Sequence, residues 1–143
     1  MTRIDFHSNA THPLEYVCRL VKKAYFSGHK LVLTSDDASQ IDLLDEALWS
    51  QHPQDFLPHC KLDDAFAPVT PIILAGEAKE LPHYDVMINL GSQLPALFSR
   101  CERLIEVVAQ DSQAVAAGRL RWAFYKDRGY ALTHHDIGRG SAP

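Results

Sequence analysis

At 143 residues the chain is long enough to bury a core in one domain without disulfide or metal staples. Its hydrophobic content of 46% and charged content of 22% are ordinary for a soluble protein; no apolar run approaches the roughly 20 residues of a membrane span, and the N-terminus lacks the apolar core of a secretory signal. A formal net charge of −4 argues against binding nucleic acid through the overall field, although it leaves room for a local basic patch.

The N-terminal half alternates apolar strands with amphipathic helices. Residues 3–7 predict a first strand. Thr11 is placed to cap a helix that tolerates Pro13 in its first turn, and Gly28 is placed to end it in the left-handed conformation. Between them, apolar residues recur at helical spacing: Leu14, Val17, Cys18, Val21 and Tyr25. The apolar run at residues 31–33 predicts a strand buried on both faces.

A second helix, capped by Ser35 or Asp36, leads into two large aromatic residues. Its buried stripe has i, i+3, i+7 spacing and consists of Ile41, Leu44 and Leu48. Trp49 lies on the flank of that stripe, and Phe56 lies beyond Pro53 in a loop. Two such rings off the core stripe indicate a docking surface. The alternative is that both fold back onto the core, as a Trp usually does.

The second half continues the alternation, with buried strands predicted at residues 72–74, 86–90 and 104–108. The pattern predicts an α/β fold, a three-layer sandwich with a mainly parallel central sheet. Its topology is Rossmann-like but lacks a nucleotide-binding loop, because no glycine follows the first strand to bring backbone amides against a phosphate. We expect a single α/β domain over residues 1–137 and a flexible C-terminal tail over residues 138–143.

Around the last of these strands, further elements complete the chain. A short helical segment is predicted at residues 93–100. A last helix, capped by Asp111 or Ser112, is predicted to end before Gly129. A final strand is predicted at residues 130–135.

No arrangement of reactive residues indicates catalysis. The eight histidines lie mostly in predicted loops and show no His-x-x-x-His on a helix, so no metal and no other cofactor is expected. His134 and His135 are adjacent and point to opposite faces of a strand. Three scattered cysteines without a Cys-x-x-Cys pair fit reduced thiols in a cytoplasm. No Gly-x-Ser-x-Gly elbow is present, and the sequence does not indicate an enzyme.

The last helix carries an aromatic residue between cations. A helical wheel predicts that its sheet-facing side consists of Ala116, Ala117, Leu120, Ala123 and Phe124. Trp122 falls roughly opposite, flanked by Arg119 and Lys126, while Arg121 and Tyr125 lie at intermediate angles. Such a surface suits a peptide with an apolar residue beside carboxylates, because the tryptophan ring can pack against the apolar side chain and an arginine can bind a carboxylate. The alternative is a solvated basic face with Trp122 covered by a loop.

Two strings resemble the chi subunit family of bacterial DNA polymerase III. The first is Leu-Asp-Glu-Ala-Leu-Trp at residues 44–49, followed by Phe-Leu-Pro-His at residues 56–59, and it is the specific one; the second is Arg-Leu-Arg-Trp at residues 119–122. In length and order of elements the resemblance covers nearly the whole chain. It implies a non-catalytic accessory subunit of the polymerase holoenzyme, acting in DNA replication and contacting DNA only indirectly.

The resemblance implies a surface for the psi subunit, which links chi to the clamp loader. The positions that match it are Trp49, Phe56, Leu57 and Pro58. Apolar anchors suit this role, since aromatic residues contribute much of the binding energy of an interface. The same surface suits a helicase-like partner.

The resemblance also implies a site for the acidic C-terminal tail of single-stranded-DNA-binding protein, which ends in a phenylalanine with a free carboxylate. The matching positions are Arg119, Arg121, Trp122, Tyr125 and Lys126. Arg119 is expected to bind the carboxylate or a tail aspartate, and Trp122 to pack on the phenylalanine. The chain departs from the family pattern in having Trp122 in place of tyrosine and Ala123 in place of lysine.

Two other functions remain open. One is a small α/β nucleotide-binding enzyme with its site at the strand ends, which the missing phosphate loop disfavours. The other is a direct single-stranded DNA binder that uses the basic-aromatic helix, which the overall acidity disfavours.

Overall fold

The computed structural model describes residues 1–51 and 53–139. Within these residues the sheet has seven strands in the order β3-β4-β2-β5-β6-β1-β7. The strands are β1 (Arg3–Ala10), β2 (Leu31–Thr34), β3 (His59–Lys61), β4 (Ile72–Ala75), β5 (Val86–Asn89), β6 (Arg103–Ala109) and β7 (Leu132–Asp136). The helices are α1 (Pro13–Phe26), α2 (Ala38–Ser50) and α3 (Ser112–Asp127).

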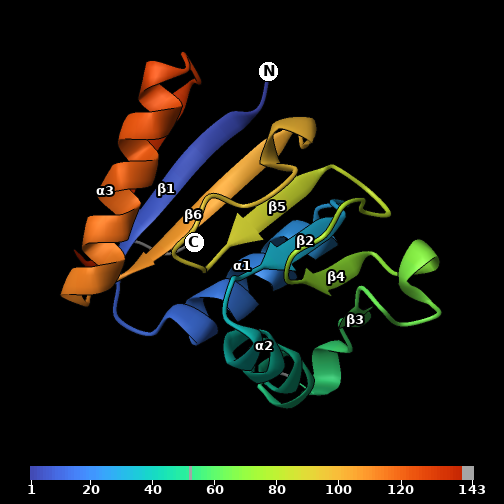
Figure 1. Ribbon diagram of the computed structural model, residues 1–143. Helices are drawn as coiled ribbons and strands as arrows, with labels where there is room; N and C mark the ends of the chain where they lie inside the picture. The colour runs from blue at the N-terminus through green and yellow to red at the C-terminus, as the bar shows by residue number, and fades with distance from the viewer. Residues whose placement is uncertain (52, 140–143) are drawn as a thin grey trace.

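The sheet is the middle layer of a three-layer sandwich. Figure 1 shows α3 on one side of it, next to β1 and β6, and α1 and α2 together on the other side. Every strand pairing is parallel, so the predicted α/β sandwich is confirmed. The central strands β2, β4 and β5 are buried at every position, because layers cover both faces of a parallel sheet. None of the described helices has the length and apolarity that a bilayer crossing requires.

The helix ends agree only in part with the sequence. Gly28 has a φ of 91° just beyond α1, and the Asp111 carboxylate accepts a hydrogen bond from the Ala114 amide at 3.0 Å, as predicted. The predicted cap of α1 at Thr11 is wrong, since the N-cap is His12 and the Thr11 hydroxyl oxygen accepts a hydrogen bond from a glutamine side chain. The cap of α2 is Asp37, one residue after the predicted pair.

Short segments account for the other differences. Strand β3 was not predicted, because three residues at a sheet edge are too few to show a period. Of the helical segment expected at residues 93–100, only Phe98–Arg100 forms a short 3-10 helix, η3. Within the tail expected at residues 138–143, residues 138 and 139 belong to a 3-10 helix, η4 (Ile137–Arg139), and residues 140–143 lie outside the described residues.

The predicted packing face of α3 is wrong. Leu120, placed by the helical wheel against the sheet, is 74% exposed, and Ala116 and Ala123 are exposed with it. The residues that α3 buries are Gly118, Arg121 and Tyr125. A wheel that sorts residues by hydrophobicity fails here because the buried side carries a charged residue, which is tolerated only with a buried partner.

Candidate binding sites

The aromatic residues after α2 are on the surface. Trp49 is 51% exposed and Phe56 is 75% exposed, so they do not fold back onto the core. Their ring centroids lie 6.3 Å apart at an interplanar angle of 76°, an edge-to-face contact. The two rings form one surface feature, which we call the aromatic patch.

Neighbouring residues hold the two rings of the aromatic patch in place. The Trp49 ring packs on the buried His59 ring, with centroids 4.3 Å apart, and His59 Nδ1 donates to a main-chain carbonyl at 2.7 Å. Phe56 has a φ of 48°, a left-handed conformation that is unfavourable for an aromatic residue. Before it, Asp55 pairs with Lys22 of α1 at 2.9 Å. This geometry presents the Phe56 ring to solvent.

Two of the residues expected in the aromatic patch are placed differently. Leu57 is only 4% exposed and belongs to the hydrophobic core between the sheet and α1 and α2, so the expectation that it is a surface contact is wrong. Pro58 is half-buried. The supporting role of His59 was missed, although His59 ends the Phe-Leu-Pro-His string.

A cavity of about 450 Å³ lies between α3 and the edge of the sheet formed by β1 and β7. Its floor is apolar, with Phe6 and Val108, and one wall is Trp122 of α3. The Trp122 and Phe6 centroids are 5.1 Å apart at an interplanar angle of 76°. Arg119 is exposed and also lines the cavity. Other polar lining side chains belong to Ser8, Asn9, Gln110 and His134. We call this the α3 cavity.

A glycine allows α3 to approach the sheet closely beside this cavity. A Cβ atom at Gly118 would lie 3.1 and 3.2 Å from the two γ-carbons of Val108, which is tighter than ordinary contact. Gly118 is buried and lines the α3 cavity together with Val108. A larger residue at position 118 would push the helix outward and change the shape of the cavity.

Two residues expected in the tail site lie instead on the buried side of α3. Arg121 is 4% exposed and Tyr125 is 0% exposed, and both bind Glu106 of β6. Arg121 Nε donates to the Glu106 carboxylate at 3.1 Å and the Tyr125 hydroxyl donates to it at 2.7 Å. Asn89 donates to its other oxygen at 2.9 Å. The expectation that Arg121 and Tyr125 face a ligand is therefore wrong, because their polar atoms are used inside the fold.

Burial governs the electrostatics of this cluster. Removal of Glu106 from water raises the pKa of its carboxyl, and the adjacent Arg121 guanidinium and the three donors oppose that rise. Burial also raises the pKa of the Tyr125 hydroxyl, as does the Glu106 carboxylate beside it. Tyr125 is therefore a hydrogen-bond donor over the physiological range, and the cluster is a structural joint between α3 and the sheet.

The remaining tail-site residues divide at the rim of the α3 cavity. Arg119 and Trp122, three residues apart on α3, both line this cavity. Trp122 is half-buried on the flank of α3 and is not opposite the sheet. Lys126 is exposed one turn further along the helix, beyond the lining residues.

The histidine pair of β7 separates as predicted. His134 faces Trp122, with ring centroids 6.2 Å apart, whereas His135 faces His7 at 5.1 Å on the opposite side of the sheet. Among the described residues, no group of three or more His, Cys, Asp or Glu side chains is arranged to hold a metal ion.

Comparison with known proteins identifies the family. The family model described as "DNA polymerase III chi subunit, HolC" matches residues 1–133. DNA polymerase III subunit chi of Pseudomonas aeruginosa is 33% identical over 97% of this chain and 99% of that protein. The Haemophilus influenzae subunit is 27% identical over 87% of each chain, and the Escherichia coli subunit is 23% identical over 82% of this chain and 81% of that protein. The chain therefore belongs to the DNA polymerase III chi subunit family.

Proposed function

We propose that this chi-family chain is a non-catalytic accessory subunit that bridges two partners during DNA replication in the cytoplasm. It would bind the clamp loader through the psi subunit, and it would bind the acidic C-terminal tail of single-stranded-DNA-binding protein. The observation that carries the proposal is the α3 cavity, which combines an apolar floor with an exposed arginine at its rim.

The α3 cavity fits a terminal phenylalanine. Phe6, Val108 and Trp122 offer an apolar wall and floor on which a benzyl ring can pack edge to face. Arg119 stands beside that space with its guanidinium available for a carboxylate, which it can bind with two parallel hydrogen bonds. Because the chain carries a net charge of −4, attraction of an acidic tail has to come from such local cations.

The departures from the family pattern affect this site in opposite directions. Ala123, where the family has a lysine, removes a cation from the exposed side of α3. Trp122, where the family has a tyrosine, gives the tail phenylalanine a larger ring to contact. Lys126 supplies a positive charge one turn away. We expect apolar contact to contribute more to tail binding and charge to contribute less. The affinity for the tail should therefore depend less on salt in this chain than in a variant with lysine at position 123.

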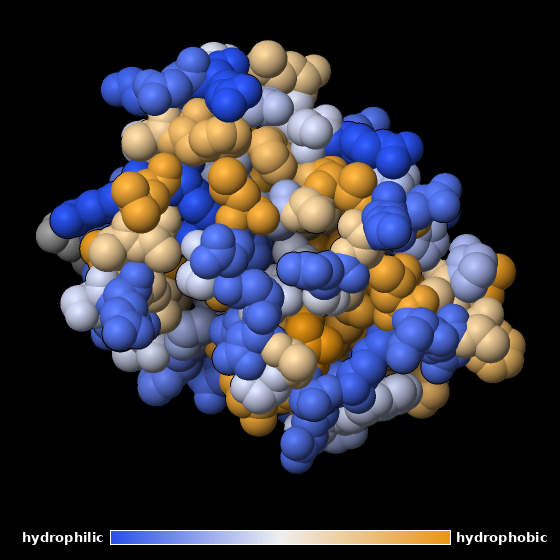
Figure 2. Space-filling model, in the orientation of Figure 1, coloured by the Kyte–Doolittle hydropathy of each residue, from blue (hydrophilic) through white to orange (hydrophobic). Residues whose placement is uncertain are grey.

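The aromatic patch is the proposed surface for psi. Trp49 and Phe56 are exposed next to one another, and the side-chain contacts of His59 and Asp55 support them in the free protein. Two preorganised rings can anchor a partner with little loss of side-chain freedom. The same patch suits a helicase-like partner, which would then compete with psi. Figure 2 shows orange apolar groups interspersed with blue polar side chains on the face of the molecule that is in view.

Calorimetric titration with a tail peptide tests the first site. The peptide should carry several aspartates and end in phenylalanine, and its C-terminally amidated form should bind more weakly. Arg119→Ala should weaken binding at least about tenfold, since it removes charge-assisted hydrogen bonds. Arg128→Ala is the matched control, because Arg128 lies over the Phe124 ring just beyond the C-terminal end of α3 and does not line the α3 cavity. Equal binding by wild type and Arg119→Ala would rule out the assignment.

Independence of the two sites tests the bridge. Trp49→Ala should lose psi in a co-purification and keep the tail peptide, whereas Trp122→Ala should do the reverse. A protein that loses both partners through either substitution would contradict two separate surfaces. A gel shift with naked single-stranded oligonucleotide separates the proposal from direct DNA binding, for which retardation would be expected.

A further inference from the structure

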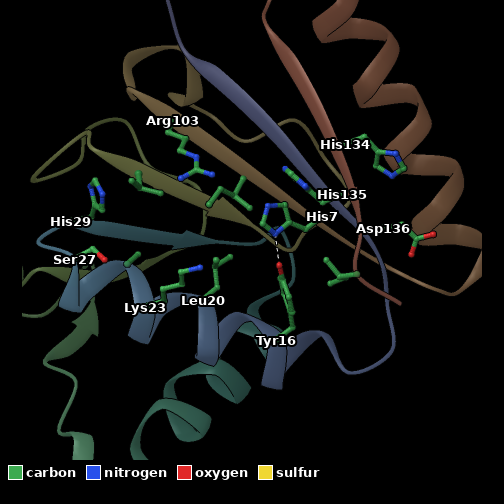
Figure 3. Close-up of a pocket in the computed structure, with 14 residues that line it drawn as sticks. His7, Tyr16, Leu20, Lys23, Ser27, His29, Arg103, His134, His135 and Asp136 are labelled. Atoms are coloured by element: carbon green, nitrogen blue, oxygen red, sulfur yellow. Dashed lines mark hydrogen bonds between the residues drawn. The ribbon is translucent and has the colours of Figure 1, made fainter. Parts of the chain in front are cut away.

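A second cavity, of about 570 Å³, lies on the side of the sheet opposite to α3. It is bounded by α1 on one side and by β1, β6 and β7 on the other, and Figure 3 shows its lining side chains. Neither the aromatic patch nor the α3 cavity includes the α1 residues that line it. The volume lies within the roughly 300–1,000 Å³ that small-molecule sites occupy.

Two cations point into this space. Figure 3 shows the Lys23 ammonium group of α1 and the Arg103 guanidinium of β6 directed toward its centre. Asp5 orients the arginine, since its Oδ2 accepts from Arg103 Nε at 2.7 Å and pairs with Nη2 at 2.5 Å. Thr133 donates to the other oxygen of Asp5. Within the described chain, Lys23 and Arg103 Nη1 have no hydrogen-bond or ion-pair partner, so both remain available to a ligand.

Apart from Asp5, which pairs with Arg103, two carboxylates lie near the cavity, those of Asp85 and Asp136, and each has a hydrogen-bond partner of its own. Asp136 points away from the centre in Figure 3 and accepts a hydrogen bond from Asn9 at 3.1 Å. Asp85 is bound by His29 at 3.2 Å and by the Lys30 amide at 3.1 Å. Burial, together with the smaller effects of His135 and Arg103, lowers the pKa of His7 to about 4, and Asp5 opposes this shift.

Flat rings line the cavity beside these cations. The His7 ring contacts Tyr16 of α1 with centroids 5.7 Å apart, and it contacts His135 with centroids 5.1 Å apart. His7 Nδ1 and the Tyr16 hydroxyl are hydrogen-bonded (dashed line in Figure 3), which fixes the His7 ring. Leu20 and Ile105 add apolar surface. One part of a ligand that fills this cavity would therefore contact the two cations, and another part would contact the aromatic and imidazole rings.

We propose that this cavity binds a small phosphate ester that carries a flat ring, of the size and chemistry of a nucleoside monophosphate. The phosphate lies between Lys23 and Arg103, and the ring packs against Tyr16 and His135. Arginine and lysine are the side chains that bind phosphate most strongly, and the preset guanidinium loses little freedom on binding. The site needs no glycine-rich loop, because side chains on the sheet face and on α1 supply the charge.

Titration of the full chain with adenosine monophosphate, adenosine and inorganic phosphate tests the proposal. We expect the monophosphate to bind and to raise the melting temperature, with adenosine and inorganic phosphate each binding more weakly. Lys23→Gln should weaken the monophosphate at least about tenfold, the usual loss for a hydrogen bond to a charged group. His135→Ala should weaken it too while sparing inorganic phosphate.

Arg19→Gln is the control, since Arg19 is an exposed cation on the same helix outside the lining. Its binding should stay within about twofold of wild type, as for other surface substitutions. Equal losses from Lys23→Gln and Arg19→Gln would overturn the site, because they would indicate only general attraction. Inorganic phosphate binding as tightly as the monophosphate would overturn the ligand class. No binding of the monophosphate at millimolar concentration would overturn both.

Discussion

Arg119 and Arg121 lie two residues apart on α3, but replacing each with methionine should affect different properties of the protein. Arg121→Met removes a guanidinium that is 4% exposed, donates to Glu106 at 3.1 Å and donates to the Ser92 carbonyl at 2.8 Å. Arg119→Met removes an exposed guanidinium at the rim of the α3 cavity. The first change is expected to act on folding and the second on binding.

The magnitude follows from what Arg121 leaves behind. Glu106 is 0% exposed and, among the residues that the structure describes, would keep Asn89 and Tyr125 as its partners. Removing one partner of a buried ion pair typically lowers the free energy of unfolding by about 3–5 kcal/mol. In a chain of this length, about 1 kcal/mol corresponds to roughly 4 °C, so we expect the melting temperature to fall by about 10–20 °C. Arg119→Met should change the stability by less than about 0.5 kcal/mol.

Urea unfolding followed by circular dichroism measures both variants, with tail-peptide titration as the second readout. The double variant Arg121→Met/Glu106→Gln should recover part of the lost stability, because no charge is then left buried. An Arg121→Met protein as stable as wild type, with impaired tail binding, would refute the structural role and return Arg121 to the tail site.

Three further outcomes are expected. Trp49→Ala should weaken psi binding by about 2–3 kcal/mol, because roughly half of a ring of about 250 Å² is open in the free protein; a titration measures this, and an unchanged affinity would contradict it. The pKa of His7 falls from 6.5 to about 4 on folding. The contribution of this shift to the free energy of unfolding is therefore complete above pH 6.5 and is lost as the pH falls toward 4. After allowance for solvent screening it amounts to roughly 2 kcal/mol, so His7→Gln should show a shallower loss of stability with acid than wild type in urea titrations. Asp111→Ala should cost about 1 kcal/mol in the same assay by removing the α3 cap, and a loss near zero would contradict the capping role.

The strands were predictable where burial is uniform. The runs at residues 72–74 and 86–90 consist of residues that a parallel sheet buries on both faces, and β4 and β5 are buried at every position. The adjacent histidines of β7 were also placed on opposite sides of the sheet, because a strand alternates its side chains. These inferences need only the local period and no information about partners.

The face of α3 was not predictable by the same reasoning. Arg121 is buried only because Glu106 lies beneath it, fifteen residues earlier in the chain, and Leu120 is exposed in consequence. No local period records such a pairing. The cavity between α1 and the sheet was missed for a related reason. Lys23 and Arg103 come from elements far apart in sequence, and only the strand order brings them together.

The way in which Phe56 is held bears on how fast the proposed partner would bind to the aromatic patch. Its neighbours are tied to different parts of the molecule: Asp55 to Lys22 of α1, and Leu57 to the core. An aromatic side chain mounted in this way returns to the same position each time a complex dissociates, so rebinding requires no reordering of the loop. Without the ion pair between Lys22 and Asp55, the loop would adopt the bound conformation less often, and the partner would associate more slowly. The ring itself would remain unaltered. In the proposed complex, a substitution at Lys22 of α1 would therefore change the association rate without changing either ring of the aromatic patch.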